Sequence, residues 1–165
     1  MPKVYDFDSM NRIAKAGSEF IEKYLRKKPN VVDVVNVEEI PAYQKRDIDL
    51  VVHVAHGENV EMYTVEIKVD QYFDKTKNYF FETISNDVYN TTGCFLKSEA
   101  DFLFYYFPNR ELHIFALGPA KEWFLKHRDE FEERSVQNQG YKSKGSLVPR
   151  KRFADENEVK VVKIL

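Results

Sequence analysis

Two neighbouring segments of the chain carry acidic and basic residues at spacings that suit catalysis. The stretch YTVEIKVD, Tyr63 to Asp70, alternates apolar and polar residues as a half-buried β-strand does. Residues two apart on a strand share a face, so Glu66 and Lys68 are expected side by side. The upstream segment DIDLVVHV places Asp47 and Asp49 on one face of a second strand. If the two strands pair with these faces together, acids and a lysine converge.

Two carboxylates and a lysine are the minimum set for metal-dependent hydrolysis of a phosphodiester bond. Carboxylate oxygens can hold one or two Mg²⁺ ions, and Mn²⁺ is expected to substitute. The metal acidifies its bound water and clamps the phosphate oxygens, and a neighbouring lysine can orient that water or stabilise the transition state. The sequence thus offers Asp49 and Glu66 as metal ligands and Lys68 beside the water. The plainer alternative is a solvated strand face with no chemistry.

The elements that must position these residues follow from the hydrophobic pattern. Apolar residues recur at helical spacing from Met10 to Leu25, after a cap at Asp8 or Ser9. The turn His56 to Asn59 predicts that the strands on either side of it form an antiparallel hairpin. The three expected strands are Val31 to Val37, Asp47 to Val54 and Glu61 to Val69.

The second half of the chain continues with strands and one helix. Asn78 to Ser85 fits a strand better than a helical turn because of its aromatic residues. The apolar runs FLFYYF and ELHIFAL form a hairpin, and a helix begins at Gly118-Pro119. Ser135 to Lys144 is polar and predicts a loop, and the final VKVVKIL predicts a strand. We therefore expect one domain over residues 1–165, of the α/β class with a mixed central sheet.

The segment RDIDLVV, a turn, and TVEIKVD together resemble the core of the PD-(D/E)XK nuclease superfamily. That group includes restriction endonucleases, Holliday-junction resolvases and RecB-type nucleases. The resemblance implies a restriction-endonuclease-like fold, with a mixed central sheet flanked by helices. It also implies an Mg²⁺-dependent deoxyribonuclease whose active site is Asp49, Glu66 and Lys68.

The superfamily pattern is kept only in part. Its proline is missing, and Ile48 precedes Asp49. RecB-like members often have a hydrophobic residue on each side of the aspartate, which favours Asp49 over Asp47. Many members also carry a glutamate near the metal on the first helix, and Glu19 or Glu22 is a loose match.

A downstream segment is similar to a set of putative phage and bacterial nucleases. It runs KTKNYFFETISN and then TTGCFLKSEADFLFYYF. The resemblance implies that Glu82 is a candidate further metal ligand and that Asn78 or Ser85 is a candidate phosphate contact. The residues that it keeps are Lys75, Thr76, Asn78, Glu82, Ser85, Gly93, Ser98, Ala100 and Asp101.

The charge distribution permits a nucleic-acid partner only through local patches. The formal net charge is −2, so the chain has no global basic signature. Two groups of basic residues flank the proposed metal site, and a third near the C-terminus extends their path, so all three would follow a DNA phosphate backbone. No recognition helix is evident, which predicts little sequence specificity. The candidate DNA contacts are Arg46, Lys75, Lys77, Asn78, Lys142, Lys144 and Arg150.

Composition excludes several other classes. No apolar run approaches the ~18 residues that a membrane span needs, so no membrane partner and a cytoplasmic location are expected. The single cysteine, Cys94, excludes an intrachain disulfide and a zinc site built from cysteines.

Two other functions stay open at this stage. One is a non-catalytic nucleic-acid-binding or assembly module that retains the nuclease fold. The other is a scaffold that uses the aromatic hairpin FLFYYF as an exposed apolar patch. For the nuclease, symmetric cutting of a duplex would require a homodimer. The expected role is an endonuclease in DNA recombination, restriction or phage DNA processing.

Overall fold

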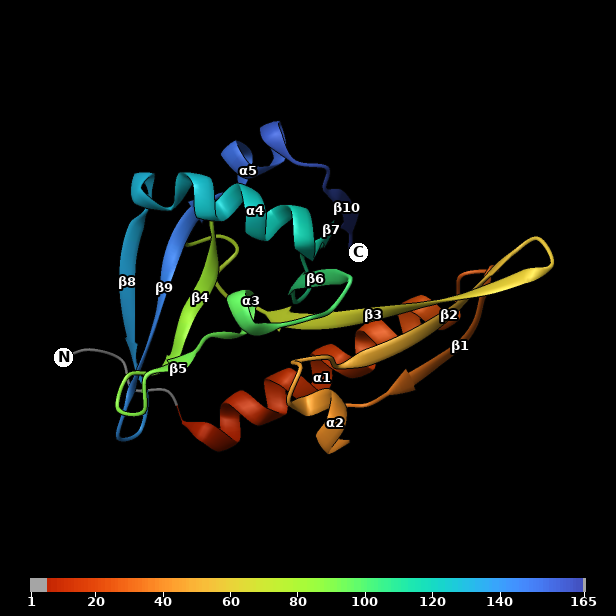
Figure 1. The fold of residues 1–165 in the computed structure, drawn as a ribbon, viewed down its shortest axis with the longest axis horizontal. Helices are drawn as coiled ribbons and strands as arrows, with labels where there is room; N and C mark the ends of the chain where they lie inside the picture. The colour runs from red at the N-terminus through yellow and green to blue at the C-terminus, as the bar shows by residue number, and fades with distance from the viewer. Residues whose placement is uncertain (1–5, 165) are drawn as a thin grey trace.

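The protein has an α/β architecture built on two β-sheets (Figure 1). The computed structural model describes residues 6–164. Six strands form a mixed sheet in the order β1-β2-β3-β6-β7-β10, and four form an antiparallel sheet in the order β5-β4-β9-β8. The strands of the mixed sheet are β1 (Val31–Asn36), β2 (Leu50–His56), β3 (Asn59–Val69), β6 (Phe102–Phe107), β7 (Glu111–Ala116) and β10 (Lys160–Lys163). Those of the second sheet are β4 (Asn78–Asn86), β5 (Thr91–Thr92), β8 (Glu132–Gln137) and β9 (Lys142–Pro149).

The helices differ greatly in length. The longest is the first, and it lies along β1 and β3, whereas α4 crosses near the second sheet (Figure 1). No helix within residues 6–164 is long and apolar enough to cross a membrane. The helices are α1 (Phe7–Arg26), α2 (Pro41–Gln44), α3 (Cys94–Lys97), α4 (Leu117–His127) and α5 (Arg150–Glu156), with a 3₁₀ turn at Arg128–Glu130.

Helix α1 begins earlier than its apolar pattern predicted. Asp6, rather than Asp8 or Ser9, is the N-cap, because its carboxylate accepts hydrogen bonds from the Ser9 amide at 3.2 Å and the Ser9 hydroxyl at 2.9 Å. The helix ends at Arg26, one residue beyond the apolar pattern that runs to Leu25.

The predicted hairpins are confirmed, and they set the order of the mixed sheet. Strands β2 and β3 pair antiparallel from Leu50 opposite Val65 to His56 opposite Asn59. Strand β3 then pairs parallel with β6, which places Glu66 beside Leu103. The chain between these parallel partners contains β4, β5 and the four-residue α3 instead of a long crossover helix. Strands β4 and β5 of the second sheet are therefore inserted in this crossover, and strands β8 and β9 come later, after α4.

One segment was assigned wrongly from sequence. Ser135 to Lys144 was predicted as a loop, but it contains the end of β8 and the start of β9, which pair antiparallel. Small residues hide the strand pattern of β9, because buried Ser143 and Gly145 carry no apolar signal. A Cβ atom at Gly145 would lie 2.6 Å from the Phe80 ring, so only glycine fits there. The predicted C-terminal strand is confirmed as β10, while Leu165 lies outside the described residues.

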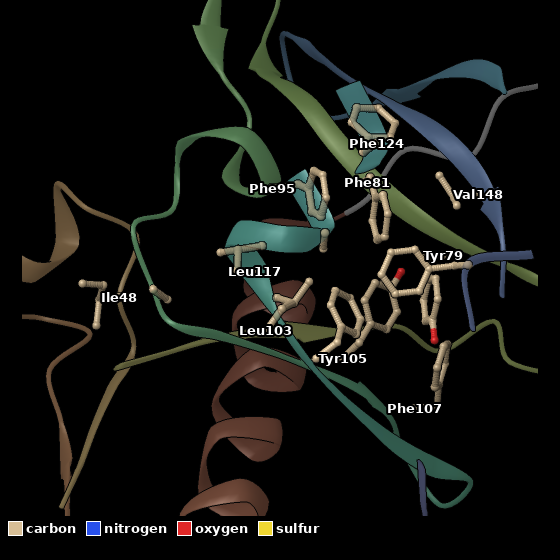
Figure 2. Close-up of a cluster of buried hydrophobic side chains, with 14 of the residues drawn as sticks. Ile48, Tyr79, Phe81, Phe95, Leu103, Tyr105, Phe107, Leu117, Phe124 and Val148 are labelled. Carbon is tan, nitrogen blue, oxygen red and sulfur yellow. The ribbon is translucent and has the colours of Figure 1, made fainter. Parts of the chain in front are cut away.

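The two faces of the mixed sheet pack against different partners. On one face, α1 buries Ile21 and Leu25 against Leu50 and Val65. The other face joins the second sheet and α4 through a dense aromatic cluster (Figure 2). In that cluster the rings of Phe81 and Phe95 stack with their centroids 3.9 Å apart. The β6 aromatic run from Leu103 to Phe107 is buried, which removes the exposed patch that a scaffold function would use.

Helix α1 approaches β3 most closely at a glycine. A Cβ atom at Gly17 would lie 2.4 Å from Cγ2 of Val69, far inside van der Waals contact. Gly17 therefore permits the helix to lie against the strand that carries Glu66 and Lys68.

We expect Gly17→Ala to destabilise the protein by about 1–2 kcal/mol, because overpacking costs more than the ~1 kcal/mol that alanine gains over glycine in a helix. Urea unfolding measures the change. The double variant with Val69→Ala should show favourable coupling, because it removes the clashing methyl group. A Gly17→Ala protein more stable than wild type would contradict this packing.

Candidate active site

Asp49 is held between two strands, although it precedes β2. The strand was predicted to begin at Asp47, but β2 begins at Leu50, and Asp47 has a positive φ of 47°. The Asp49 amide donates to the Val65 carbonyl at 2.8 Å, and its carbonyl accepts from the Val37 amide at 2.8 Å. The ladder between β2 and β3 begins at Leu50 opposite Val65, so Asp49 lies just before its first pair.

The irregular start of β2 also changes which side chains face the core under α1. On a regular strand Ile48 would share a face with Leu50, but it lies in the aromatic cluster on the opposite face of the sheet. Regular alternation fails because the backbone turns at Asp47. The expectation that Asp47 and Asp49 share a face of one strand is therefore wrong, because both residues precede β2.

The carboxyl groups of Asp49 and Glu66 line the same cleft and lie near enough for each to shift the pKa of the other. Asp49 Oδ2 also accepts a hydrogen bond from the Ile67 amide at 2.7 Å, which fixes its direction. Glu66 is only 8% exposed, and its Oε2 atom is buried without a hydrogen-bond partner. A buried carboxylate oxygen with no partner is costly, and a cation would satisfy it.

Burial and like charge both oppose ionisation of this pair. Burial, with a smaller contribution from the Glu38 carboxylate, raises the pKa of Asp49 to about 6, although the Ile67 amide opposes the shift. Burial and then the charges of Asp49 and Asp47 raise the pKa of Glu66 well above its usual value. Full ionisation at neutral pH therefore requires a positive charge beside the two carboxylates.

Lys68 lies on the same strand face as Glu66. Burial lowers the pKa of its ammonium group, but nearby Cys94 and the carboxylates of Glu82, Asp70 and Glu66 outweigh that effect and raise it. Lys68 is therefore a cation that donates hydrogen bonds and cannot accept a proton. Its Nζ atom lies 5.8 Å from the centroid of the Phe80 ring.

All three predicted catalytic residues line one cleft. Asp49, Glu66 and Lys68 contribute to the lining of a cavity of about 580 Å³. Residues of α1, β4, β8 and β9 line the same cavity, so the second sheet and the first helix form its walls. The structure therefore brings together, in a sheltered place, the three side chains that the sequence singled out.

The alternative acids have different positions. Glu19 is exposed, and Glu22 accepts a hydrogen bond from the Asn36 side chain at 3.4 Å. Neither lines the cleft, whereas Glu82 does and accepts from the Cys94 amide at 3.3 Å. Asp47 forms an ion pair with Lys97, with Nζ and Oδ2 3.8 Å apart, and does not line the cleft.

Sequence reasoning missed two acids of the cleft lining, Glu38 and Asp70, and the Asp70 carboxylate accepts a hydrogen bond from the Tyr105 hydroxyl at 2.9 Å. Glu38 lines the cleft near Asp49 and accepts a hydrogen bond from the Ser18 hydroxyl of α1. Glu38 occurs in an irregular segment after β1 with no periodic pattern, so no sequence signal distinguishes it from an ordinary surface glutamate.

The seven predicted DNA contacts are dispersed, and only Asn78 lines the cleft. Arg46 forms an ion pair with Glu99 at 3.2 Å. The Arg150 guanidinium packs over the Phe73 ring, 4.3 Å from its centroid, and donates to the Phe73 carbonyl at 3.1 Å. Arg150 therefore has a structural role. The other four lie outside the cleft lining: Lys75, Lys77 and Lys142 are exposed and Lys144 is half-buried.

Several residues of the downstream motif have structural roles. The Asp101 carboxylate accepts from the Thr64 amide at 2.8 Å and the Thr64 hydroxyl at 3.0 Å, which joins β6 to β3. The Ser98 hydroxyl donates to the Asp47 carbonyl at 2.7 Å and stabilises the turn before Asp49. A Cβ atom at Gly93 would lie 2.6 Å from the Glu82 backbone. These residues support the site without entering it.

The donors present suit Mg²⁺ better than a transition metal. Within residues 6–164, no three or more His, Cys, Asp or Glu side chains converge on one metal position. Mg²⁺ is commonly held by one or two carboxylates, with waters and substrate phosphate completing its shell. Asp49 and Glu66 meet that requirement, and the unpartnered Oε2 of Glu66 is the observation that fits a missing cation.

Comparison with protein-family models, with curated proteins and with solved structures finds no match to this chain. The functional argument therefore depends on the residues and geometry described above. The strongest part of that geometry is the placement of Asp49, buried Glu66 and Lys68 in one cleft.

We expect Glu66→Gln to raise the melting temperature in chelator at pH 8, because it removes a buried, crowded charge. The raised pKa values mean that wild type loses stability as pH rises through about 6, where Asp49 ionises, and the variant should lose less. Mg²⁺ should raise the melting temperature of wild type by about 2–4 °C for each kcal/mol of binding free energy. It should have little effect on the melting temperature of the variant.

Calorimetry from pH 5 to pH 8, with and without Mg²⁺, makes this comparison. Glu61→Gln is the matched control, since Glu61 is exposed on the same strand. A Glu66→Gln protein that melts below wild type in chelator would show that the carboxyl pair is not strained.

Proposed function

We propose that this protein is a metal-dependent nuclease that hydrolyses DNA phosphodiester bonds. The observation that carries the proposal is the shared cleft of Asp49, Glu66 and Lys68, in which the buried Glu66 Oε2 has no hydrogen-bond partner. The mixed sheet, with Asp49 before its second strand and Glu-x-Lys on its third, agrees with a restriction-endonuclease-like core.

In this proposal each residue has a distinct task. Asp49 and Glu66 hold Mg²⁺, which when bound acidifies a water molecule and offsets charge on the phosphate. The Ile67 amide keeps the Asp49 carboxylate in position. Lys68, as a fixed ammonium, donates a hydrogen bond to the attacking water or to a phosphate oxygen, where negative charge grows in the transition state.

The surroundings of the site support chemistry over simple binding. A module that only binds nucleic acid gains nothing from burying two carboxyl groups together, since they repel phosphate. The cost of that burial is explained if a cation and a phosphate complete the site. Glu82, which lines the cleft, is a candidate further ligand in the same proposal.

We expect Asp49→Asn, Glu66→Gln and Lys68→Met each to reduce DNA cleavage about 100-fold or more, because each removes a ligand or a charge-stabilising donor. A gel assay with Mg²⁺ or Mn²⁺ on duplex, branched and single-stranded DNA measures the rates. Glu61→Gln should cleave as wild type does. Cleavage that survives EDTA or Glu66→Gln, or no cleavage of any of these DNA forms, would contradict the proposal.

A further inference from the structure

The cleft that contains Asp49, Glu66 and Lys68 has extensive apolar walls. One wall is the N-terminal half of α1, and the other comes from the second sheet. A DNA duplex presents charged backbone to its surroundings and keeps the flat faces of its bases inside the stack. Apolar walls next to the candidate catalytic residues therefore suit bases that are exposed. The apolar lining residues outside the catalytic set include Met10, Ile13, Ala14, Phe80, Val136 and Leu147.

The size of the cleft also limits what can reach the carboxyl pair. Its volume is about 580 Å³, which is within the ~300–1,000 Å³ of ordinary small-molecule sites. Such a space holds a nucleotide or two and does not hold a double helix. Because Glu66 is 8% exposed, the scissile phosphate must enter the cleft to meet it.

The charges that line the cleft favour a ligand with a low density of phosphate charge. Duplex DNA carries one negative charge per ~1.7 Å of its axis, twice the density of one strand. The lining contains five acidic residues and only two basic ones, and a duplex would be repelled more strongly than a single strand. The acidic residues are Glu38, Asp49, Glu66, Asp70 and Glu82, and the basic residues are Lys68 and Arg134.

Phe80 supplies a fixed ring beside the candidate catalytic lysine. It is half-buried on β4, and its amide donates to the Tyr105 hydroxyl at 2.9 Å, which holds its backbone in place. The Lys68 Nζ atom lies 5.8 Å from the ring centroid. A base stacked on this ring would have its phosphate close to Lys68. Aromatic rings that stack bases are the usual means of binding single-stranded DNA.

We propose that the cleft binds single-stranded DNA, with one base on the Phe80 ring, and that it excludes duplex DNA. This inference rests on the proposed function, because it takes the substrate of the same site to be DNA. It predicts that the strand enters between α1 and the second sheet. Duplexes are then substrates only where a strand is frayed, flipped or free.

The test uses fluorescence anisotropy with the Glu66→Gln protein in Mg²⁺, which separates binding from cleavage. A fluorescein-labelled oligothymidylate should bind at least about tenfold more tightly than the same strand annealed to its complement at the same salt concentration. Phe80→Ala, added to this background, should weaken single-strand binding about tenfold through lost stacking.

A second pair of variants keeps the test valid if Phe80→Ala unfolds. Ala14 is exposed on α1 and lines the cleft, whereas Ala16 is exposed on the same helix outside the lining. Ala14→Trp should fill the cleft and reduce single-strand binding about tenfold or more, and Ala16→Trp should not.

The binding results test this inference separately from the nuclease proposal. Tighter binding of duplex, equal binding of both forms, no binding of either, or single-strand binding unaffected by Ala14→Trp would overturn the inference. Duplex cleavage by wild type at the single-strand rate would also overturn it while leaving the nuclease proposal intact. Single-strand binding in the cleft with no cleavage by wild type would support it and contradict the nuclease proposal.

Discussion

Two neighbouring carboxyl groups, buried Glu66 and half-buried Asp49, constrain much of the structure around them. Asp49 meets Glu66 because β2 pairs with β3 in the register that sets Leu50 opposite Val65. A slip of one residue would send one member of the pair to the opposite face, against α1. The backbone of Asp49 is bonded on both sides, to Val37 and to Val65, which makes that slip costly.

The scaffold keeps this pair rigid and sheltered. Helix α1 lies against the apolar face of β3, where Gly17 allows a close approach at Val69. The second sheet and its aromatic cluster lie on the polar face and turn what would be a wet strand surface into a cleft. The Ile67 amide satisfies Asp49 Oδ2, whereas Glu66 Oε2 is left without a partner. A buried group that the fold leaves unsatisfied is typical of a site completed by a ligand.

The sequence predicted the parts of this arrangement that depend on local pattern. Alternation in YTVEIKVD gave the face shared by Glu66 and Lys68, and the turn at Gly57 gave the hairpin that brings Asp49 to them. Prediction from sequence failed where contacts between residues distant in the chain determine the structure. The contact of Glu38 with Ser18 and the burial of Arg150 between aromatic rings leave no local trace. Strand β9 was missed because its buried positions are serine and glycine.

The backbone turn at Asp47 illustrates a further limit of pattern analysis. A strand over Asp47 to Val54 was predicted to carry both aspartates, but both precede β2, and only Asp49 lines the cleft. Asp47 instead pairs with Lys97, and its carbonyl is held by Ser98. Asp47 differs from Asp49 through its tertiary contacts with Lys97 of α3 and with Ser98, which the local sequence does not reveal.

The most direct measurement is anomalous diffraction from crystals of the protein grown with Mn²⁺. The account predicts an anomalous peak within about 2.0–2.3 Å of a carboxylate oxygen of Asp49 and of Glu66. It also predicts that the peak is lost in Glu66→Gln. No peak at this pair, or a peak only elsewhere in the cleft near Asp70 and Glu82, would contradict the claim that the Asp49 and Glu66 carboxylates form a metal site.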